Sequence, residues 1–178
     1  MKSKLVSLSA ISSALTALSL TIGAYVEIAD LSALVLSSIF IIMPLYYNSY
    51  KASFLTSFVG VIIAFLSSGF NIMSLVFPSY VVFFGVYPIL RFFMSEKIKN
   101  KWLIYIIGSI WFILTVYGMY FYYTTVMGVL INDLPLWLLN NILYWIAPLA
   151  LIIYIVYDKF IMVSKGVLDR YIGRIIKR

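Results

Sequence analysis

The sequence predicts an all-α membrane protein, a polytopic bundle of six transmembrane helices that forms one domain over residues 1–178. Composition is the first observation behind this prediction, since 64% of the residues are hydrophobic and only 11% are charged. A soluble domain needs a polar shell and carries about 25% charged residues. The second observation is that the apolar residues form six runs, each close to the roughly 20 residues that a helix needs to cross the hydrocarbon core.

Short polar breaks bound the predicted spans. The first run is longer than the apolar part of a signal peptide and no small-x-small site follows it, so we expect it to stay in the protein. We expect the last span to continue into a cytoplasmic amphipathic tail over residues 159–178. The breaks are Met1-Lys2-Ser3-Lys4, Glu27-Ile28-Ala29-Asp30, Asn48-Ser49-Tyr50-Lys51, Ser67-Ser68-Gly69-Phe70-Asn71, Ser95 to Lys101 and Asn132-Asp133-Leu134-Pro135. The spans between them are predicted at residues 5–25, 31–47, 52–68, 72–94, 102–126 and 136–157.

The positive charges predict the orientation, with both termini in the cytoplasm. With six spans, all 13 Lys and Arg residues fall on the same side of the membrane as the N-terminus. The charged residues of the loops on the other side are Glu27, Asp30 and Asp133. Loops rich in Lys and Arg stay in the cytoplasm, and an odd number of spans would destroy this separation. We therefore expect a multi-pass protein of the cell membrane whose basic side faces the anionic inner leaflet, and not a nucleic acid.

The sequence offers little for catalysis. It has no Cys and no His, which removes thiol nucleophiles, zinc-thiolate sites and the commonest general base. Charges avoid the centres of the predicted spans, and Arg91, the nearest, is expected to extend to the inner interface. Intramembrane charges usually mark proton relays and ion paths. The sequence therefore favours neither an ion-coupled carrier nor an enzyme, and it predicts no cofactor and no metal.

Aromatic and amide side chains gather at the outer ends of the predicted spans. Tyr and Trp there commonly form a belt against lipid, but a belt does not explain Asn140 and Asn141, because an unpartnered amide in hydrocarbon costs several kcal/mol. On a helix these amides share a face with Trp137 and Tyr144. The alternative to a belt is an outward-open pocket for a small neutral or weakly polar solute. Its candidate residues are Asn71, Tyr80, Tyr120, Tyr123, Trp137, Asn140, Asn141 and Tyr144.

Small residues recur every four positions in the first predicted span. Ser9, Ser13 and Ala17 form one such row, and Ala10 and Ala14 form another. This spacing lets a second helix backbone approach closely. The face of Ala10, Ala14 and Ala17 either packs on another span of the same chain or docks a partner membrane protein.

In span count, length, orientation and the Ala10-x-x-x-Ala14 pattern, the chain resembles the substrate-binding S components of energy-coupling factor (ECF) transporters. In that family a motif of this type meets a transmembrane coupling subunit, and two ABC ATPases complete the importer. The segment Phe83-Phe84-Gly85-Val86-Tyr87-Pro88-Ile89 also resembles the Phe-Phe-Gly-x-Tyr-Pro-Ile segment of small, uncharacterised S-component-like membrane proteins. One departure is the first outer loop, near Glu27 to Asp30, which is shorter than the capping loop of a vitamin binder.

The resemblance implies the substrate-binding membrane subunit of an ECF-type ABC importer, which takes up a small solute such as a vitamin or related micronutrient. The alternative is a non-transport membrane scaffold of cell-envelope machinery, similar to the small multispan protein of the bacterial rod-shape system. An outer pocket distinguishes the two, because a scaffold does not need one. A membrane enzyme is a third reading. Its only candidate acids are Glu27, Asp30 and Asp133, which also suit solvated loops.

Overall fold

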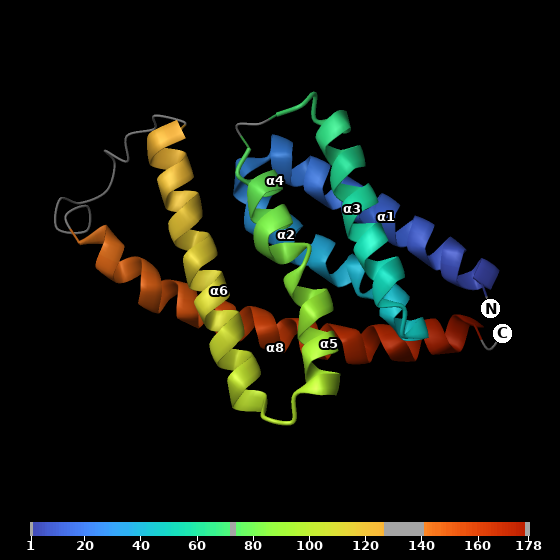
Figure 1. The fold of residues 1–178 in the computed structure, drawn as a ribbon. Helices are drawn as coiled ribbons and strands as arrows, with labels where there is room; N and C mark the ends of the chain where they lie inside the picture. The colour runs from blue at the N-terminus through green and yellow to red at the C-terminus, as the bar shows by residue number, and fades with distance from the viewer. Residues whose placement is uncertain (1, 72–73, 127–140, 177–178) are drawn as a thin grey trace.

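The computed structural model describes residues 2–71, 74–126 and 141–176, and these residues fold into helices with no strand among them (Figure 1). The predicted all-α class is therefore confirmed. The elements in chain order are α1 (Lys2–Tyr25), η1 (Glu27–Ala29), α2 (Asp30–Ile41), η2 (Met43–Tyr47), α3 (Tyr50–Ser67), α4 (Val76–Ser79), η3 (Tyr80–Phe84), α5 (Tyr87–Lys97), α6 (Lys101–Phe121), η4 (Tyr122–Val126) and α8 (Ile142–Ile176).

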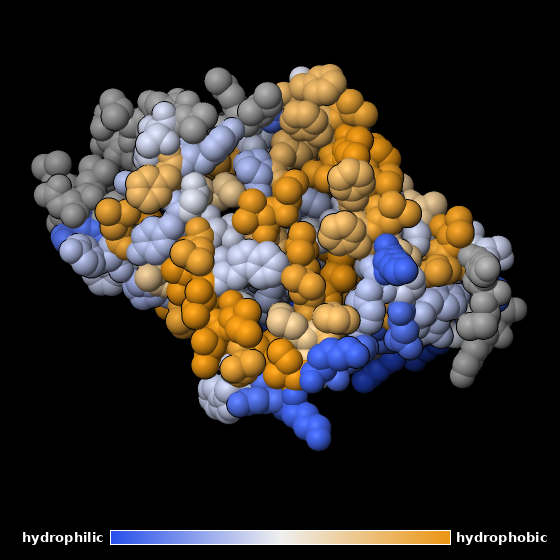
Figure 2. All heavy atoms as spheres, in the orientation of Figure 1, coloured by the Kyte–Doolittle hydropathy of each residue, from blue (hydrophilic) through white to orange (hydrophobic). Residues whose placement is uncertain are grey.

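Six helical segments of the described residues are long and apolar enough to cross a membrane, so the prediction of six membrane-length helices is confirmed. Many large apolar side chains on these segments are exposed, as a surface in contact with lipid requires. Figure 2 shows these apolar side chains over the middle of the molecule, with hydrophilic residues gathered toward its lower edge. The six segments are Ser3–Tyr25, Asp30–Tyr47, Tyr50–Ser67, Val76–Lys97, Lys101–Thr125 and Leu143–Arg174.

Helices α1, α2 and α3 form one closely packed unit. Gly60 of α3 shows how near the backbones come, because a Cβ atom added there would lie 2.7 Å from Thr16 Cγ2 of α1. Small side chains permit this approach, and hydroxyl groups can hydrogen-bond across the contact. The buried small and hydroxyl residues of the unit are Ser12, Ser13, Thr16, Ala17, Ser19, Ala33, Ser37, Ser38, Ser53, Thr56, Ser57 and Ala64.

The fourth membrane-length segment is broken in its middle. The short helix α4 passes through the π-helical turn η3, and the chain then turns at Gly85 and Val86 before α5 begins. Pro88 explains the break, because proline has no N–H to give to the carbonyl of residue 84 and its ring crowds that carbonyl. The segment therefore consists of two half-helices joined at Gly85-Val86, within the Phe83–Ile89 segment.

Helix α8 is a single helix of 35 residues. At 1.5 Å per residue it is about 52 Å long, well beyond the hydrocarbon core of about 30 Å. One helix therefore covers most of the predicted last span and most of the tail after it. The C-terminal end of α8 lies beside the N-terminal end of α1, where Ile172 shares a hollow with Ser3 and Lys4 (Figure 1).

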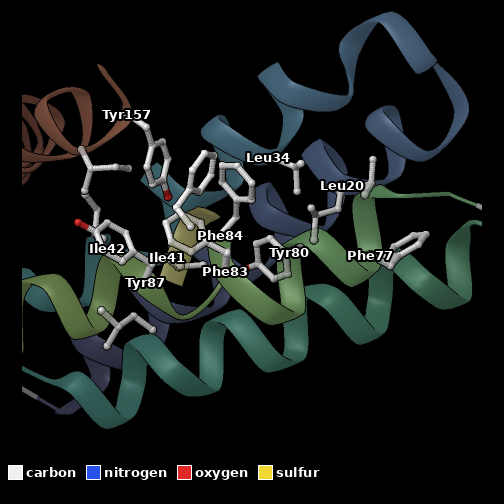
Figure 3. Packing of buried hydrophobic residues seen from close by; sticks show 14 of the residues in the cluster. Leu20, Leu34, Ile41, Ile42, Phe77, Tyr80, Phe83, Phe84, Tyr87 and Tyr157 are labelled. Carbon is white, nitrogen blue, oxygen red and sulfur yellow. The ribbon is translucent and has the colours of Figure 1, made fainter. Parts of the chain in front are cut away.

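An aromatic cluster forms the centre of the core. Figure 3 shows Phe83 and Phe84 from η3 close to Tyr87 of α5 and Tyr157 of α8. Phe83 stacks on Tyr87 with ring centroids 4.7 Å apart, and it contacts Phe112 of α6 edge-on at 4.8 Å. The cluster therefore joins both half-helices of the broken segment to α6 and α8.

Candidate functional site

Serine side chains satisfy the carbonyl groups that the break in the fourth segment leaves free. Ser38 of α2 donates from Oγ to the Phe84 carbonyl at 2.9 Å, and Ser57 of α3 donates to the Gly85 carbonyl at 3.0 Å. Free backbone groups inside a membrane need such partners. Gly85 is required for the contact, since an added Cβ atom would lie 2.8 Å from Ser57 Oγ. Side chains of α2 and α3, within the packed unit of α1 to α3, thus stabilise the break through hydrogen bonds.

Two buried tyrosines extend this polar contact. The Tyr80 hydroxyl lies 3.0 Å from Ser57 Oγ, and the Tyr157 hydroxyl donates to Ser38 Oγ at 2.9 Å. Both side chains are almost fully buried. Because Tyr157 belongs to α8, hydrogen bonds connect α8 through Ser38 of α2 to the break.

A buried ion pair between α5 and α8 lies beside this contact, because Asp158 directly follows Tyr157. Arg91 of α5 donates from Nε to Asp158 Oδ1 at 2.7 Å and from Nη2 to Oδ2 at 3.3 Å. The Tyr87 hydroxyl donates to the same Oδ1 at 2.5 Å, and it lies 2.8 Å from the Tyr154 hydroxyl. Arg91 is 3% exposed and Asp158 is 0% exposed. We call these four residues the charge cluster.

The charge cluster corrects the interpretation of Arg91. Its guanidinium is buried against Asp158, and it lies over the Tyr105 ring at 5.2 Å. The sequence predicted an Arg91 side chain that extends to the inner interface, and the structure shows it in a buried ion pair. Charges inside membrane segments are costly and usually functional. The sequence argument against an ion-coupled carrier assumed that the spans hold no such charge, and the Arg91–Asp158 pair removes that assumption.

The sequence prediction missed Asp158 because it ended the last span at Tyr157. Each charged residue carries a local signal in the sequence, although neither signal identifies its partner. Tyr87 precedes Arg91 by four residues, and Tyr154 precedes Asp158 by four, which places each tyrosine beside its charged partner on one helix face. The charge cluster thus consists of one Tyr-x-x-x-Arg pattern from α5 and one Tyr-x-x-x-Asp pattern from α8.

A small polar hollow lies at the other end of the bundle. It has a volume of about 290 Å³ and is formed by α1, α2, the α3–α4 connection and η4. The Asn71 amide donates to the Ala24 carbonyl at 3.4 Å, so the α3–α4 connection is tied to α1. The lining residues are Gly23, Ala24, Asp30, Asn71, Ser74, Leu75 and Tyr123. We call this the outer hollow, because its residues belong to the ends of the spans that the sequence predicts to lie outside.

The structure brings together only part of the predicted pocket. Asn71 and Tyr123 both line the outer hollow. Tyr80 lies in the core against Ser57, away from the hollow, and Tyr120 is half-buried near the end of α6. The others fall elsewhere: Asn141 is exposed in the turn before α8, Tyr144 is 80% exposed, and Trp137 and Asn140 lie outside the described residues.

The small-residue face of α1 divides into two parts. Ala17 is buried in the core, as is Ser13. Ala10 and Ala14 are exposed. Internal packing therefore accounts for Ala17, while Ala10 and Ala14 keep a surface that another helix could approach.

Comparison of the chain with protein-family models, with curated proteins and with solved structures finds no match. The function has to be inferred from the residues and their geometry.

Proposed function

We propose that the chain is the substrate-binding membrane subunit of an ECF-type importer, and that the outer hollow holds its solute. The hollow is the observation that carries the proposal, because it places a carboxyl group, an amide and hydroxyl groups around one space. Its volume of about 290 Å³ is close to the lower end of ligand pockets, which are about 300–1,000 Å³. The proposal therefore favours a small polar solute, such as a vitamin fragment or related micronutrient.

The charges support an orientation with this hollow outside and both termini in the cytoplasm. Lys51, Lys97 and Lys101 lie at the ends of helices opposite the hollow, and Asp30 lines the hollow itself. Loops rich in Lys and Arg stay inside. In this orientation, solute enters the hollow from outside the cell membrane.

Energy for uptake comes from partners in this proposal. Ala10 and Ala14 supply an exposed small-residue surface on α1, which suits close approach by a helix of a coupling membrane subunit. Two ABC ATPases would complete the complex. The scaffold alternative leaves the outer hollow without a purpose.

Native mass spectrometry of the tagged chain, purified from its own membrane in mild detergent, tests the solute site. We expect a bound small molecule that Asn71→Ala and Tyr123→Phe both lose. Tyr144→Phe is the matched control, because it also removes one hydroxyl group but from outside the hollow, and it should keep the bound mass. A wild-type chain that carries no small molecule, or an equal occupancy in all variants, would refute the site.

A further inference from the structure

The inner half of the broken segment is attached unequally on its two flanks. Toward α8, α5 makes the buried contacts of the charge cluster. Toward α3, it makes an exposed hydrogen bond between Tyr50 and Glu96, and it borders an apolar groove of about 540 Å³. The groove is lined by Tyr50, Lys51, Phe54, Leu55, Phe58, Ile89, Leu90 and Phe93. The polar contacts of α5 are therefore buried toward α8 and exposed toward α3.

The N-terminal end of α5 is not continuous with the helix before it. Gly85 and Val86 lie in a turn, and the two carbonyls there bond to Ser38 and Ser57 instead of to backbone N–H groups of α5. Pro88 has no N–H, so it cannot make the helical hydrogen bond to the Phe84 carbonyl that would continue α5 through this turn. A rotation of α5 about Gly85-Val86 would thus leave both serine bonds in place, because they hold the outer side of the turn.

We propose that α5 is a hinged half-helix that rotates about Gly85-Val86, and that the Arg91–Asp158 pair is the latch that holds it against α8. Tyr87 strengthens the latch, since it donates to the same Asp158 oxygen that Arg91 Nε binds. When the latch opens, α5 moves away from α8 toward the groove beside α3. Only the purpose of this motion rests on the proposed function, in which it opens the inner half of the bundle to release solute.

The size of the motion follows from the length of α5. Ser95 lies ten residues beyond Gly85, which is about 15 Å along a helix. Kinks at proline commonly exceed about 20°, so the hinge is assigned a rotation of about that size. Ser95 would then move by about 5 Å.

Electron–electron distance measurements between spin labels test the latch in nanodiscs without solute. The chain has no Cys, so Ser95→Cys with Gly166→Cys reports the distance between α5 and α8. The control pair is Gly118→Cys with Gly166→Cys, which joins α6 to α8. An added Cβ atom at either glycine meets no other atom within 4 Å.

We expect a second distance, shifted by about 5 Å, for the α5–α8 pair in Asp158→Asn and no change for the control pair. Tyr87→Phe should show the same shifted distance in a smaller fraction of molecules, and it decides the matter where Asp158→Asn does not fold. An unchanged α5–α8 distance would overturn the latch, as would equal broadening of both pairs. Since no solute is present, failure of the solute site leaves this result untouched, and the reverse also holds.

Discussion

Removal of the negative charge at Asp158 should strongly destabilise the protein. Asp158→Asn keeps the shape of the side chain but leaves Arg91 buried without a counter-charge, and it weakens the acceptor for Tyr87. Breaking a buried ion pair costs about 3–5 kcal/mol. Because Arg91 is 3% exposed and Asp158 is 0% exposed, water cannot screen the loss. We therefore expect a decrease in the free energy of unfolding within that range.

The assay is unfolding in mixed micelles, followed by circular dichroism as the fraction of denaturing detergent rises. Asp169→Asn is the matched control, because Asp169 pairs with Lys165 on the more exposed part of α8 at 2.6 Å. Such surface pairs contribute about 0.3–0.5 kcal/mol. The reasoning is refuted if the two Asp→Asn variants unfold at the same point.

A second variant separates lost charge from lost packing. Replacing both partners, as in Arg91→Met with Asp158→Leu, leaves no buried charge. Apolar replacement of a buried pair is often neutral or stabilising. The double variant should therefore be more stable than Asp158→Asn alone, by about 2 kcal/mol or more.

The remaining predictions concern packing and use the same unfolding assay. Gly108→Ala should cost about 1–3 kcal/mol, because the new Cβ atom would collide with the Tyr154 hydroxyl. Gly118→Ala on the same helix meets open space and should be neutral or stabilise by up to about 1 kcal/mol; equal effects at both glycines would contradict the packing. Ala17→Leu should cost about 1–3 kcal/mol because Ala17 is buried. Ala14 is exposed, so the stability of Ala14→Leu should stay within about 0.5 kcal/mol of the wild type. A larger loss for Ala14→Leu than for Ala17→Leu would contradict the burial of Ala17 and the exposure of Ala14.

Hydropathy was sufficient to predict the six membrane-length helices, because each must supply enough apolar length on its own. The break in the fourth segment was within reach too, since Pro88 removes a helical hydrogen bond wherever it occurs. The serines that repair the break could not be assigned from sequence. They come from α2 and α3, and only the folded chain shows which hydroxyl groups face residues 84 and 85.

Long-range pairing is the part that sequence reasoning could not supply. Arg91 and Asp158 are 67 residues apart, and no local pattern states that they meet. The small-residue face shows the same limit. Ala10 and Ala17 are seven residues apart and lie near the same helix face, yet one is exposed and the other is buried. The part of α1 that neighbouring helices cover depends on where along its length those helices cross it.

The outer hollow was predicted in part. Asn71 and Tyr123 were expected at an outer site and do share one hollow. Gly23 and Ala24 were not expected there, because they lie in an apolar run with no polar side chain to mark them. Asp30 was expected as a loop acid or as a candidate acid of a membrane enzyme, and it lines the same space.

Co-purification of the tagged chain from its native membrane in mild detergent, followed by mass spectrometry, tests the central claim most directly. The account predicts a coupling membrane subunit together with two ABC-type ATPases. It also predicts that Ala14→Leu loses them, while Gly118→Leu, an added bulk on the open side of α6, keeps them. Recovery of cell-wall synthesis or cytoskeletal proteins instead, or of no partner at all, would contradict the importer and favour the scaffold.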